Sequence, residues 1–452
     1  MIIVALVILV LALATGPLAR TASRARPPLV AHVPGQPAWV RAEPPFPFRV
    51  WLVAAAIAVV LTVGAIVAQP AFQVAAAFFG LGVLGLITAI FRRYASGCQE
   101  VRDALVAYRP RIAMPYAGKV GIHIGMWSPW IDRTEIPWVI VARSPALFHQ
   151  LAAMYPDTPI VEGEIPASVT GAFYSHGAGA NADFIAGSTA THVFLGHGDS
   201  DKPLSASERV LQYDLVTVAG QAAIDRFVAA GLDVPADRIR VIGRPQTEGI
   251  AIGARRVPPN PTVLYAPTWR HADDALNVSS LAVADRIVQA LLDRGCTVAF
   301  RRHFAGQNHV EAEAMIVRVN ELLMADYERT KRPHWWGPEA MERPLIDAFN
   351  DADAMVSDVS GIVVDFMASV KPVVMYAAQF TDPDAFRAAH PTAQAAYVID
   401  RDLTQLDAAL GSALGKDPLA AARAERADHY LGGPDRARPA QRFIDLVTEL
   451  GS

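Results

Sequence analysis

The chain has 452 residues, a mean hydropathy of +0.25 and 52% hydrophobic residues, so it is too long for one domain and too apolar for a purely soluble protein. Its formal charge of −4 and its pI of about 6.3 give no electrostatic reason to expect nucleic-acid binding. Two cysteines, Cys98 and Cys296, are too few for the disulfide framework of a small secreted domain.

Three uncharged apolar segments near the N-terminus predict transmembrane helices. Residues 2–19, 50–68 and 71–91 are each close to the roughly 20 residues that a helix needs to cross a bilayer. An alternative for the first segment is a cleaved signal peptide, although no basic residue precedes its apolar run. Arginines between the first two segments, and at positions 92–93, predict a multi-pass protein of the cell membrane whose remaining residues are cytoplasmic.

From about residue 118, short apolar runs alternate with amphipathic stretches, which is typical of parallel βα units. The first series of predicted strands is 120–124, 138–142, 192–195, 215–218 and 239–242. After a Pro-rich break at 257–261, the second series is 263–266, 298–300, 354–356, 373–376 and 396–399. The predicted fold class is α/β, with two Rossmann-like domains preceded by three transmembrane helices.

The predicted boundaries are 1–95 for the membrane domain, 96–256 for an N-terminal acceptor domain and 257–452 for a C-terminal nucleotide-donor domain. Apolar residues at helical spacing predict helices at 220–230 and 281–294. A last helix at 439–450 begins with a proline and has an apolar stripe, so we expect it to pack across the two domains.

A histidine motif follows the predicted strand 192–195. Ligands of open α/β sheets bind beyond the carboxyl ends of strands, and Gly196 and Gly198 would let the backbone turn sharply there. His197 between them could take a proton from an attacking hydroxyl near neutral pH. The alternative is a loop histidine bonded to backbone. Asp199 and Lys202 complete the motif as predicted substrate contacts.

Three further motifs follow strands of the second series. Their predicted ligand-binding residues are Thr268, Trp269, Arg270, Arg301, His303, Ser357, Asp358 and Ser360. Alternation along an extended strand puts Arg301 and His303 on one face, where they would hold a diphosphate by charge-assisted hydrogen bonds. The serines bracket a strand-to-helix turn that would bind a phosphate or would only cap the helix. Together the motifs predict a site for a nucleotide diphosphate.

Two other site types are not predicted. The run 177–182 approximates a dinucleotide fingerprint, but the strand before it is short, and the acidic residue expected about 20 positions later falls inside the His197 motif. No zinc-like His/Cys spacing and no Gly-x-Ser-x-Gly elbow occurs in the sequence. We therefore expect neither a cofactor nor a bound metal.

The ordered set of motifs resembles the CDP-glycerol glycerophosphotransferase family of teichoic acid polymerases and primases, over residues 115–445. The motifs are His197-Gly-Asp-Ser-Asp-Lys202, Tyr265-Ala-Pro-Thr-Trp-Arg270, Arg301-Arg-His303 and Ser357-Asp-Val-Ser360. The resemblance implies a GT-B fold and the transfer of glycerol phosphate from CDP-glycerol to a hydroxyl of a lipid-linked or cell-wall polymer acceptor, with release of CMP. It also implies that His197 and His303 are catalytic, His197 as general base, and that Arg301, His303, Ser357 and Ser360 form the diphosphate cradle.

The chain departs from the family pattern at three places. Asp199-Ser200 replaces Thr-Pro after His-Gly, the Gly-Tyr-Pro-Arg-Asn-Asp element appears as Gly243-Arg-Pro-Gln-Thr-Glu248, and Gly361 replaces the second serine of Asp-Tyr-Ser-Ser. Two alternatives therefore stay open. One is a GT-B glycosyltransferase that uses a UDP- or GDP-sugar, and the other is a non-catalytic relative that binds a nucleotide.

Overall fold

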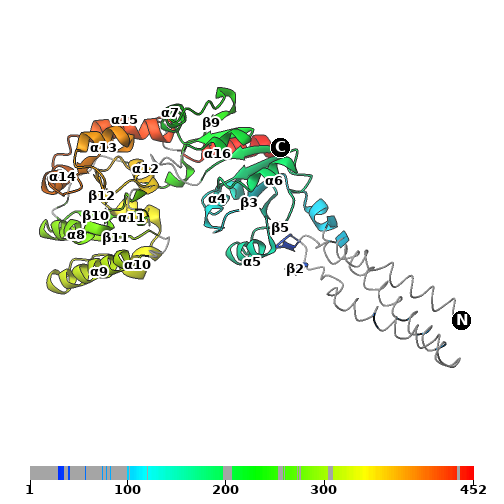
Figure 1. The fold of residues 1–452 in the computed structure, drawn as a ribbon, viewed down its shortest axis with the longest axis horizontal. Helices are drawn as coiled ribbons and strands as arrows, with labels where there is room; N and C mark the ends of the chain where they lie inside the picture. The colour runs from blue at the N-terminus through cyan, green and yellow to red at the C-terminus, as the bar shows by residue number, and fades with distance from the viewer. Residues whose placement is uncertain are drawn as a thin grey trace.

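A computed structural model describes residues 29–34, 39–40, 99–100, 102–119, 121–196, 206–252, 258, 260–271, 273, 276–303, 309–434 and 438–452, together with positions 56, 74, 78 and 82. These residues form two α/β lobes, each built on one sheet (Figure 1). The two Rossmann-like sheets that the sequence predicts are therefore confirmed, in agreement with the GT-B architecture that the resemblance implies.

The first sheet has nine strands in the order β2-β1-β5-β4-β3-β6-β7-β8-β9. Its parallel strands are β3 (Ile112–Tyr116), β4 (Trp138–Ala142), β5 (Ile160–Glu162), β6 (Gly171–Tyr174), β7 (Thr191–Phe194), β8 (Leu215–Val218) and β9 (Ile239–Val241), and the short antiparallel strands are β1 (Val30–Ala31) and β2 (Trp39–Val40). Every residue of β3, β4 and β6 is buried, because helices cover both faces of a parallel sheet.

The helices of this lobe are short. Those that precede the second lobe in the sequence include α4 (Ser128–Ile131), α5 (Pro145–Met154), α6 (Asn181–Ala186) and α7 (Gln221–Ala229). The Oγ of Ser144 caps α5 by accepting a hydrogen bond from Leu147 N, and a proline follows at the first helical position.

The second sheet has five parallel strands in the order β11-β10-β12-β13-β14. They are β10 (Thr262–Tyr265), β11 (Thr297–Phe300), β12 (Ala354–Ser357), β13 (Val373–Tyr376) and β14 (Tyr397–Ile399). One face packs against α8 (Ala284–Asp293), α9 (Val310–Thr330) and α14 (Leu406–Ala413). The other face packs against α11 (Leu345–Asp351), α12 (Gly361–Met367), α13 (Pro383–Ala389) and α15 (Ala420–Leu431), while α10 (Gly337–Glu342) lies beside β11.

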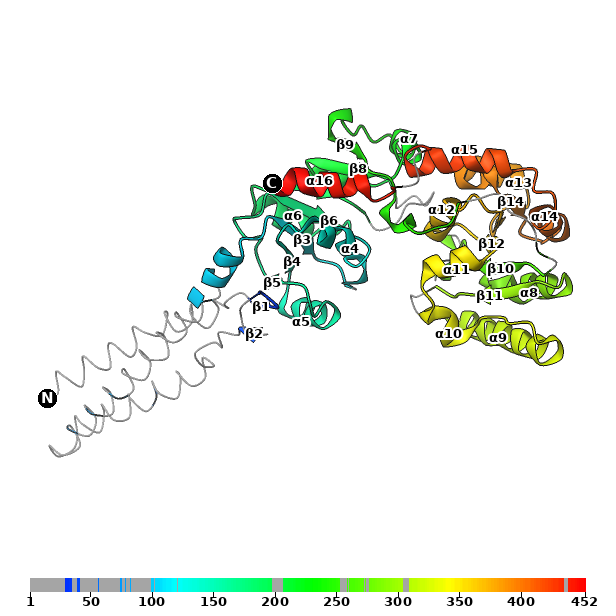
Figure 2. The ribbon, with the colours of Figure 1, turned by 180° about the vertical axis from the view of Figure 1, so that it is seen from behind.

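The C-terminal helix α16 (Gln441–Gly451) lies in the first lobe, although α15 before it belongs to the second (Figure 2). Phe443 packs against Trp127 and Phe173, with ring centroids 4.9 and 5.9 Å apart. The guanidinium of Arg111 donates hydrogen bonds to the carbonyls of Gly451 and Ser452 at 3.2 and 2.6 Å. The end of the chain is thus held against the sheet of the first lobe.

The predicted strand at 120–124 is wrong, because a 3-10 turn, η1 (Gly121–His123), occupies this place. The turn packs closely on α5: a Cβ on Gly121 would lie 2.3 Å from a methyl carbon of Leu151. The sequence prediction also missed β3 beside it. Pro115 argues against a central strand, since it cannot donate to a ladder, but it lies beyond the β6 pairing, which ends at Ala113.

The prediction of three transmembrane helices, and with it the multi-pass location in the cell membrane, is contradicted. Within the part of the chain that the structure describes, no helix combines the length and the apolarity needed to cross a bilayer. The longest helix there, α9, has 21 residues but carries Glu311 and Glu313 in its first turn. The segments 2–19, 50–68 and 71–91 lie outside the described residues, apart from positions 56, 74, 78 and 82.

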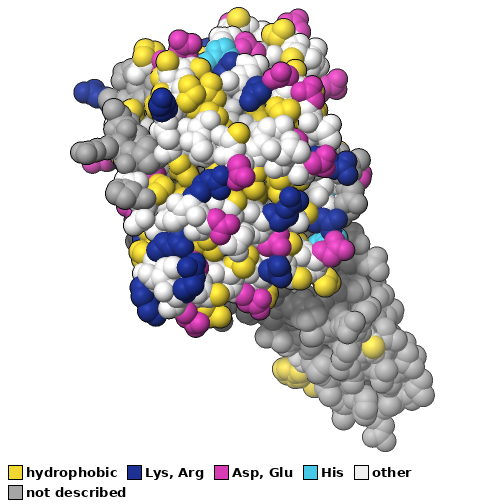
Figure 3. All heavy atoms as spheres, turned by 90° about the vertical axis from the view of Figure 1, so that its left-hand side faces the viewer, with side chains coloured by type: hydrophobic (Ala, Val, Ile, Leu, Met, Phe, Trp, Pro, Cys, Tyr) yellow, Lys and Arg dark blue, Asp and Glu magenta, His cyan; other side chains and the backbone are white. Residues whose placement is uncertain are grey.

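The outer face of the second lobe carries both signs of charge. Lys and Arg side chains alternate with Asp and Glu across the face that Figure 3 shows, with small apolar areas between them. Neither sign of charge therefore dominates this face.

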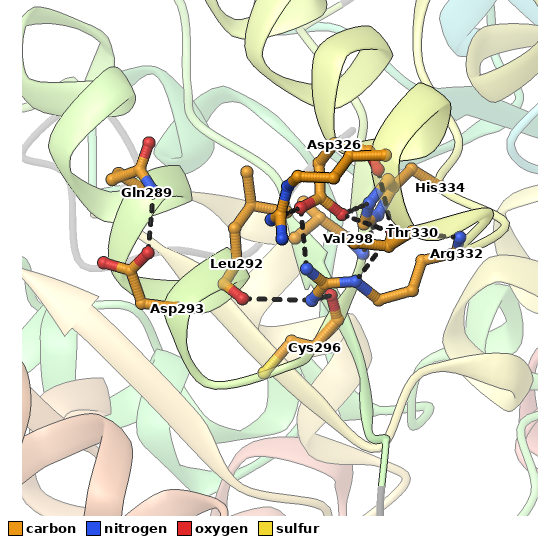
Figure 4. A network of polar contacts seen from close by, with 10 residues as sticks. Gln289, Leu292, Asp293, Cys296, Val298, Asp326, Thr330, Arg332 and His334 are labelled. Carbon is orange, nitrogen blue, oxygen red and sulfur yellow. Dashed lines mark hydrogen bonds and ion pairs between the residues drawn. The ribbon is translucent and has the colours of Figure 1, made fainter.

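A buried polar network joins the end of α9 to β11 (Figure 4). The side chain of Asp326 is 3% exposed, and it accepts hydrogen bonds from His334 Nε2 at 2.9 Å, Arg332 Nη2 at 2.7 Å and Thr330 Oγ1 at 2.9 Å. Because His334 Nδ1 accepts a hydrogen bond from Val298 N at 2.9 Å, its proton lies on Nε2. Burial alone would raise the pKa of Asp326, but the bonds from His334 and Thr330 and the charge of Arg332 lower it below its usual value.

Replacing Asp326 by alanine should destabilise the protein by about 3 kcal/mol, because His334 and Arg332 would stay buried without their acceptor. The measurement is the free energy of unfolding from denaturant titration. The matched control is Asp384→Ala, which removes an Asp–Arg ion pair whose carboxylate is 89% exposed. Equal effects of the two substitutions would contradict the role of the network.

His334 should make the stability depend on pH. Burial, only partly opposed by the bond to Asp326, lowers its pKa in the folded state below 6.5. The unfolded chain therefore binds more protons as the pH falls through 6.5, and stability is lost on that side. Between pH 7.5 and 5.5 the unfolding free energy of the wild type should fall more than that of His334→Gln. A constant difference between the two proteins would refute this assignment.

Candidate active site

Three neighbouring strand ends of the second sheet carry the predicted donor-binding residues. Strand β10 lies between β11 and β12, and Tyr265 pairs with Phe300 on one side and with Val356 on the other. Because all strands of this sheet are parallel, the segments that follow them emerge at one edge. The structure therefore brings 266–270, 301–303 and 357–360 together at the carboxyl edge.

Asp358 is enclosed at this edge and is 0% exposed. Its two carboxylate oxygens accept hydrogen bonds from Thr268 N at 3.0 and 3.1 Å, and its Oδ2 also accepts from the N and Oγ of Ser280 at 2.8 and 2.9 Å. The carboxylate thus joins the end of β12 to two separate parts of the segment after β10. These hydrogen bonds suit a residue that fixes the positions of the loops at this edge.

Two more predicted residues are buried with partners in the protein. Ser357 is 0% exposed, and its Oγ donates to the carbonyl of Ala266 at 2.6 Å. Thr268 is also buried, and its carbonyl accepts a hydrogen bond from Ser279 Oγ at 2.7 Å. Ser360 differs from both. It is the partly exposed N-cap residue of α12, and its hydroxyl makes no capping hydrogen bond to this helix.

The guanidinium of Arg301 is bound to the end of α10. Its Nη1 donates to the carbonyls of Ala340 and Arg343 at 2.7 Å each, and its Nη2 donates to the carbonyl of Met341 at 3.2 Å. Helix C-termini carry unpaired carbonyls and partial negative charge, which explains the attraction. Burial lowers the pKa of Arg301, but an arginine keeps its charge. His303, two residues further on, is partly exposed.

Trp269 and Arg270 form the rim of this edge. Trp269 is 40% exposed, and its ring lies 5.2 Å from that of His271. Arg270 Nη1 donates to Glu311 Oε2 at 2.9 Å and contacts the ring of His309. The pair links the loop after β10 to the first turn of α9, and Glu311 is 78% exposed, so the bond is weak enough for a ligand anion to compete.

The predicted base motif is only partly described. The structure does not describe His197, Gly198, Asp199 or Lys202. After β7, the last described residue before this gap is Gly196. Gly196 has φ +68°, a conformation that favours glycine, and its carbonyl accepts a hydrogen bond from Trp127 Nε1 at 2.9 Å. A pocket opens here at the carboxyl ends of β7, β8 and β9, and its walls include Trp127, Gly196, Thr217, Arg226 and Arg244.

An ion pair connects this pocket to the second lobe. Arg244 Nε donates to Asp365 Oδ1 at 2.5 Å and Nη2 donates to Oδ2 at 3.3 Å, with side chains only 6% and 12% exposed. Arg244 follows β9, whereas Asp365 belongs to α12, whose N-cap is Ser360. The pair therefore ties the helix of the donor edge to the pocket beside Gly196.

Sequence reasoning missed Asp365 and Ser280. Asp365 stands in the apolar run 361–367, and a lone carboxylate in such a run signals a buried partner. Ser280 has no comparable signal, because its partner Asp358 lies 78 residues away.

The chain thus has two α/β lobes, an edge with arginine, histidine and serine side chains in one, and a pocket at the sheet edge of the other. Residues 206–388 match the family model described as CDP-Glycerol:Poly(glycerophosphate) glycerophosphotransferase. The match covers less than half of the chain, but it confirms the resemblance noted in the sequence and indicates a CDP-glycerol glycerophosphotransferase-like transferase. The matched region includes the three strand ends of the second sheet and begins after the His197 motif.

Several solved structures are similar to this chain. The wall teichoic acid polymerase TagF is 12% identical, over 75% of this chain and 88% of that one, with a TM-score of 0.46. MurG of Acinetobacter baumannii is 13% identical, over 75% and 100%, with a TM-score of 0.44. HepE of Anabaena, solved with UDP and glucose, is 14% identical, over 75% and 99%, with a TM-score of 0.44. No curated protein matches the sequence.

The Arg244–Asp365 pair should respond differently to single and to double replacement. Asp365→Leu or Arg244→Met alone should lower the unfolding free energy by about 3 kcal/mol, because each leaves an uncompensated buried charge. The double variant should recover most of that loss, since it leaves no charge behind. Denaturant titration of the four proteins measures the cycle. Losses that simply add in the double variant would show that the two side chains do not act as a pair.

Proposed function

We propose that the protein transfers glycerol phosphate from CDP-glycerol to a hydroxyl of a polymer or lipid-linked acceptor and releases CMP. The observation that carries the proposal is the convergence of 266–270, 301–303 and 357–360 at one sheet edge, inside the region that matches the family. Nucleotide diphosphates bind at such edges because side chains and helix N-termini there bind anions.

In the proposed reaction, the acceptor oxygen attacks the phosphorus that carries the glycerol. A new P–O bond forms to the acceptor, the P–O–P bond to the cytidine-bearing phosphate breaks, and the electron pair leaves with CMP. The acceptor proton passes to a base, the role that we propose for His197. Charge that develops on the transferred phosphoryl group needs fixed donors, which is the usual source of rate enhancement in phosphoryl transfer.

The geometry divides the donor-edge residues into two groups. We assign direct donor contacts to His303, Ser360, Trp269 and Arg270, whose side chains are at least partly exposed. We assign positioning roles to Arg301, Ser357, Asp358 and Thr268, whose polar atoms bind the protein itself. We assign Gly196, together with Gly198, Asp199 and Lys202 of the same sequence motif, to acceptor binding.

Full-length protein supplied with CDP-glycerol and a short synthetic oligo(glycerol phosphate) should release CMP. His303→Ala should lower the rate on the order of 100-fold through lost donor stabilisation, and His197→Ala on the order of 100-fold through loss of the general base. The matched control is His149→Ala on the exposed face of α5, which should keep the wild-type rate. Chromatography of the released nucleotide gives the measurement.

The nucleotide that is released distinguishes glycerol phosphate transfer from glycosyl transfer. Release of UDP or GDP from a sugar donor, with CDP-glycerol inert, would replace the proposal by glycosyl transfer. Binding of CDP-glycerol without any turnover, for both the oligomer and a lipid-linked acceptor, would refute the transferase activity of this chain.

A further inference from the structure

A second group of histidines lies at the carboxyl edge of the first sheet, outside the motifs that the sequence singled out. Strand β6 pairs with β7 so that Tyr174 lies opposite Phe194. His176 and Gly196 are each two residues beyond this pair, so they emerge at the same level. Both Gly177 and Gly196 lie against the ring of Phe194, where an added Cβ would stand 3.6 and 3.7 Å away. The imidazole of His176 thus belongs to the strand end beside the predicted base motif.

His176 is stacked on His123 and is packed near Tyr116. The two imidazole centroids are 5.4 Å apart with an interplanar angle of 17°, and the Tyr116 ring lies 6.2 Å from that of His176. The hydroxyl of Tyr116 forms a hydrogen bond of 3.0 Å with Nδ1 of His123. Burial raises the pKa of Tyr116 to about 12, so its hydroxyl stays protonated at neutral pH. Tyr116 ends β3, His123 lies in the turn η1, and His176 follows β6, so three separate segments form this cluster.

The backbone around both imidazoles is fixed. Asn181 Nδ2 donates to the carbonyl of His176 at 2.7 Å. Tyr155 donates from its hydroxyl to the carbonyl of Gly121 at 2.8 Å and accepts from Gly125 N at 2.9 Å, so it braces both ends of the turn that carries His123. A cluster held in this way presents its ring nitrogens in a defined place and needs little reorganisation to bind a ligand.

The cluster combines imidazoles with a cation at its rim. Arg209, in the 3-10 turn η4 (Glu208–Gln212), is exposed and donates from Nη1 to the carbonyl of Gly177 at 3.2 Å. Burial, and the charge of Arg209, lower the pKa of His176 below its usual value. Near neutral pH this imidazole is therefore uncharged, and a neutral imidazole can accept a hydrogen bond from a hydroxyl. A nearby guanidinium suits a phosphate next to that hydroxyl.

We propose that His176, His123 and Arg209 bind the end of the acceptor chain, with the imidazoles on its terminal hydroxyl and the guanidinium on its nearest phosphodiester. The inference rests on the proposed function and adds which residues hold the end of its acceptor, an alditol phosphate chain with a free hydroxyl. Because the cluster and Gly196 lie on neighbouring strand ends, the bound hydroxyl would be held near Gly196, the residue that precedes His197 in the sequence, and positioning of this kind strongly accelerates a bimolecular transfer.

The test is calorimetric binding of two probes, CDP-glycerol and a short synthetic oligo(glycerol phosphate), to the full chain. His176→Gln should weaken the oligomer about tenfold, as expected for the loss of one hydrogen bond in a charged site, and should leave the affinity for CDP-glycerol unchanged. In steady-state assays the same variant should raise the KM for the oligomer and not that for CDP-glycerol. His149→Gln, on exposed α5, is the matched control and should change neither probe.

Arg209→Gln gives an independent variant at an exposed position, so it tests the inference even if the buried edge does not tolerate a substitution. It should weaken the oligomer and reduce the salt dependence of its binding, since one ionic contact is lost. Wild-type affinity of both variants for the oligomer would overturn the inference while leaving the proposed function intact. Parallel loss of both probes in His176→Gln would also overturn it, as a structural effect. Failure of the wild type to bind CDP-glycerol would refute the proposed function, and the inference with it.

Discussion

The shape of the carboxyl edge of the second sheet depends on the hydrogen bonds that one buried carboxylate accepts. A charged group in the interior is costly unless hydrogen bonds replace its water, and Asp358 obtains these bonds from the backbone of Thr268 and from both polar groups of Ser280. The donors come from segments 78 to 90 residues away in the chain. Their arrangement turns the loop after β10 back over the end of β12, and this fold of the loop places Trp269 and Arg270 at the rim. Ser357 at the end of β12 also donates a hydrogen bond to the carbonyl of Ala266, the first residue after β10. The residues that would contact a donor are therefore held by residues that would not.

Polar contacts also join the two lobes. Besides Arg244 and Asp365, Asn350 accepts a hydrogen bond from Ala251 N at 2.7 Å and donates to the carbonyl of Gly249 at 2.9 Å, while His429 on α15 lies 2.8 Å from Asp225 on α7. Figure 2 shows α7 and α15 beside one another where the lobes meet. Apolar residues meet there as well, since Ala222 and Ile250 belong to the same buried cluster as Tyr430 and Leu431. The buried Arg244–Asp365 pair lies between α12 and the pocket beside Gly196.

The sequence predicts those features of the structure that are determined by residues close together in the chain. Strands 138–142, 215–218 and 373–376 were predicted with their observed bounds, because a buried parallel strand is a short apolar run between polar segments. Strand β3 was missed because Pro115 contradicts that local pattern, and 120–124 was assigned to a strand although Gly121 packs on α5 as a turn. The same limit applies to the site. Placement at strand ends is local and could be predicted, whereas the partners of Arg301, at Ala340 to Arg343, come from a helix 40 residues further on.

The two sheet edges differ in the chemistry that they provide, and the difference follows from their charge. The edge of the second sheet has Arg270, His303 and the N-cap Ser360, which suit an anionic diphosphate. The edge of the first sheet has the stacked pair His123 and His176, in which protonation of both rings would place two like charges at a centroid separation of 5.4 Å. Stacking thus works together with burial to keep an imidazole neutral. A neutral imidazole can accept a hydrogen bond from a hydroxyl, whereas a protonated ring cannot. One edge is therefore suited to bind an anion and the other to bind a hydroxyl, and α12 is linked to the first lobe through Asp365.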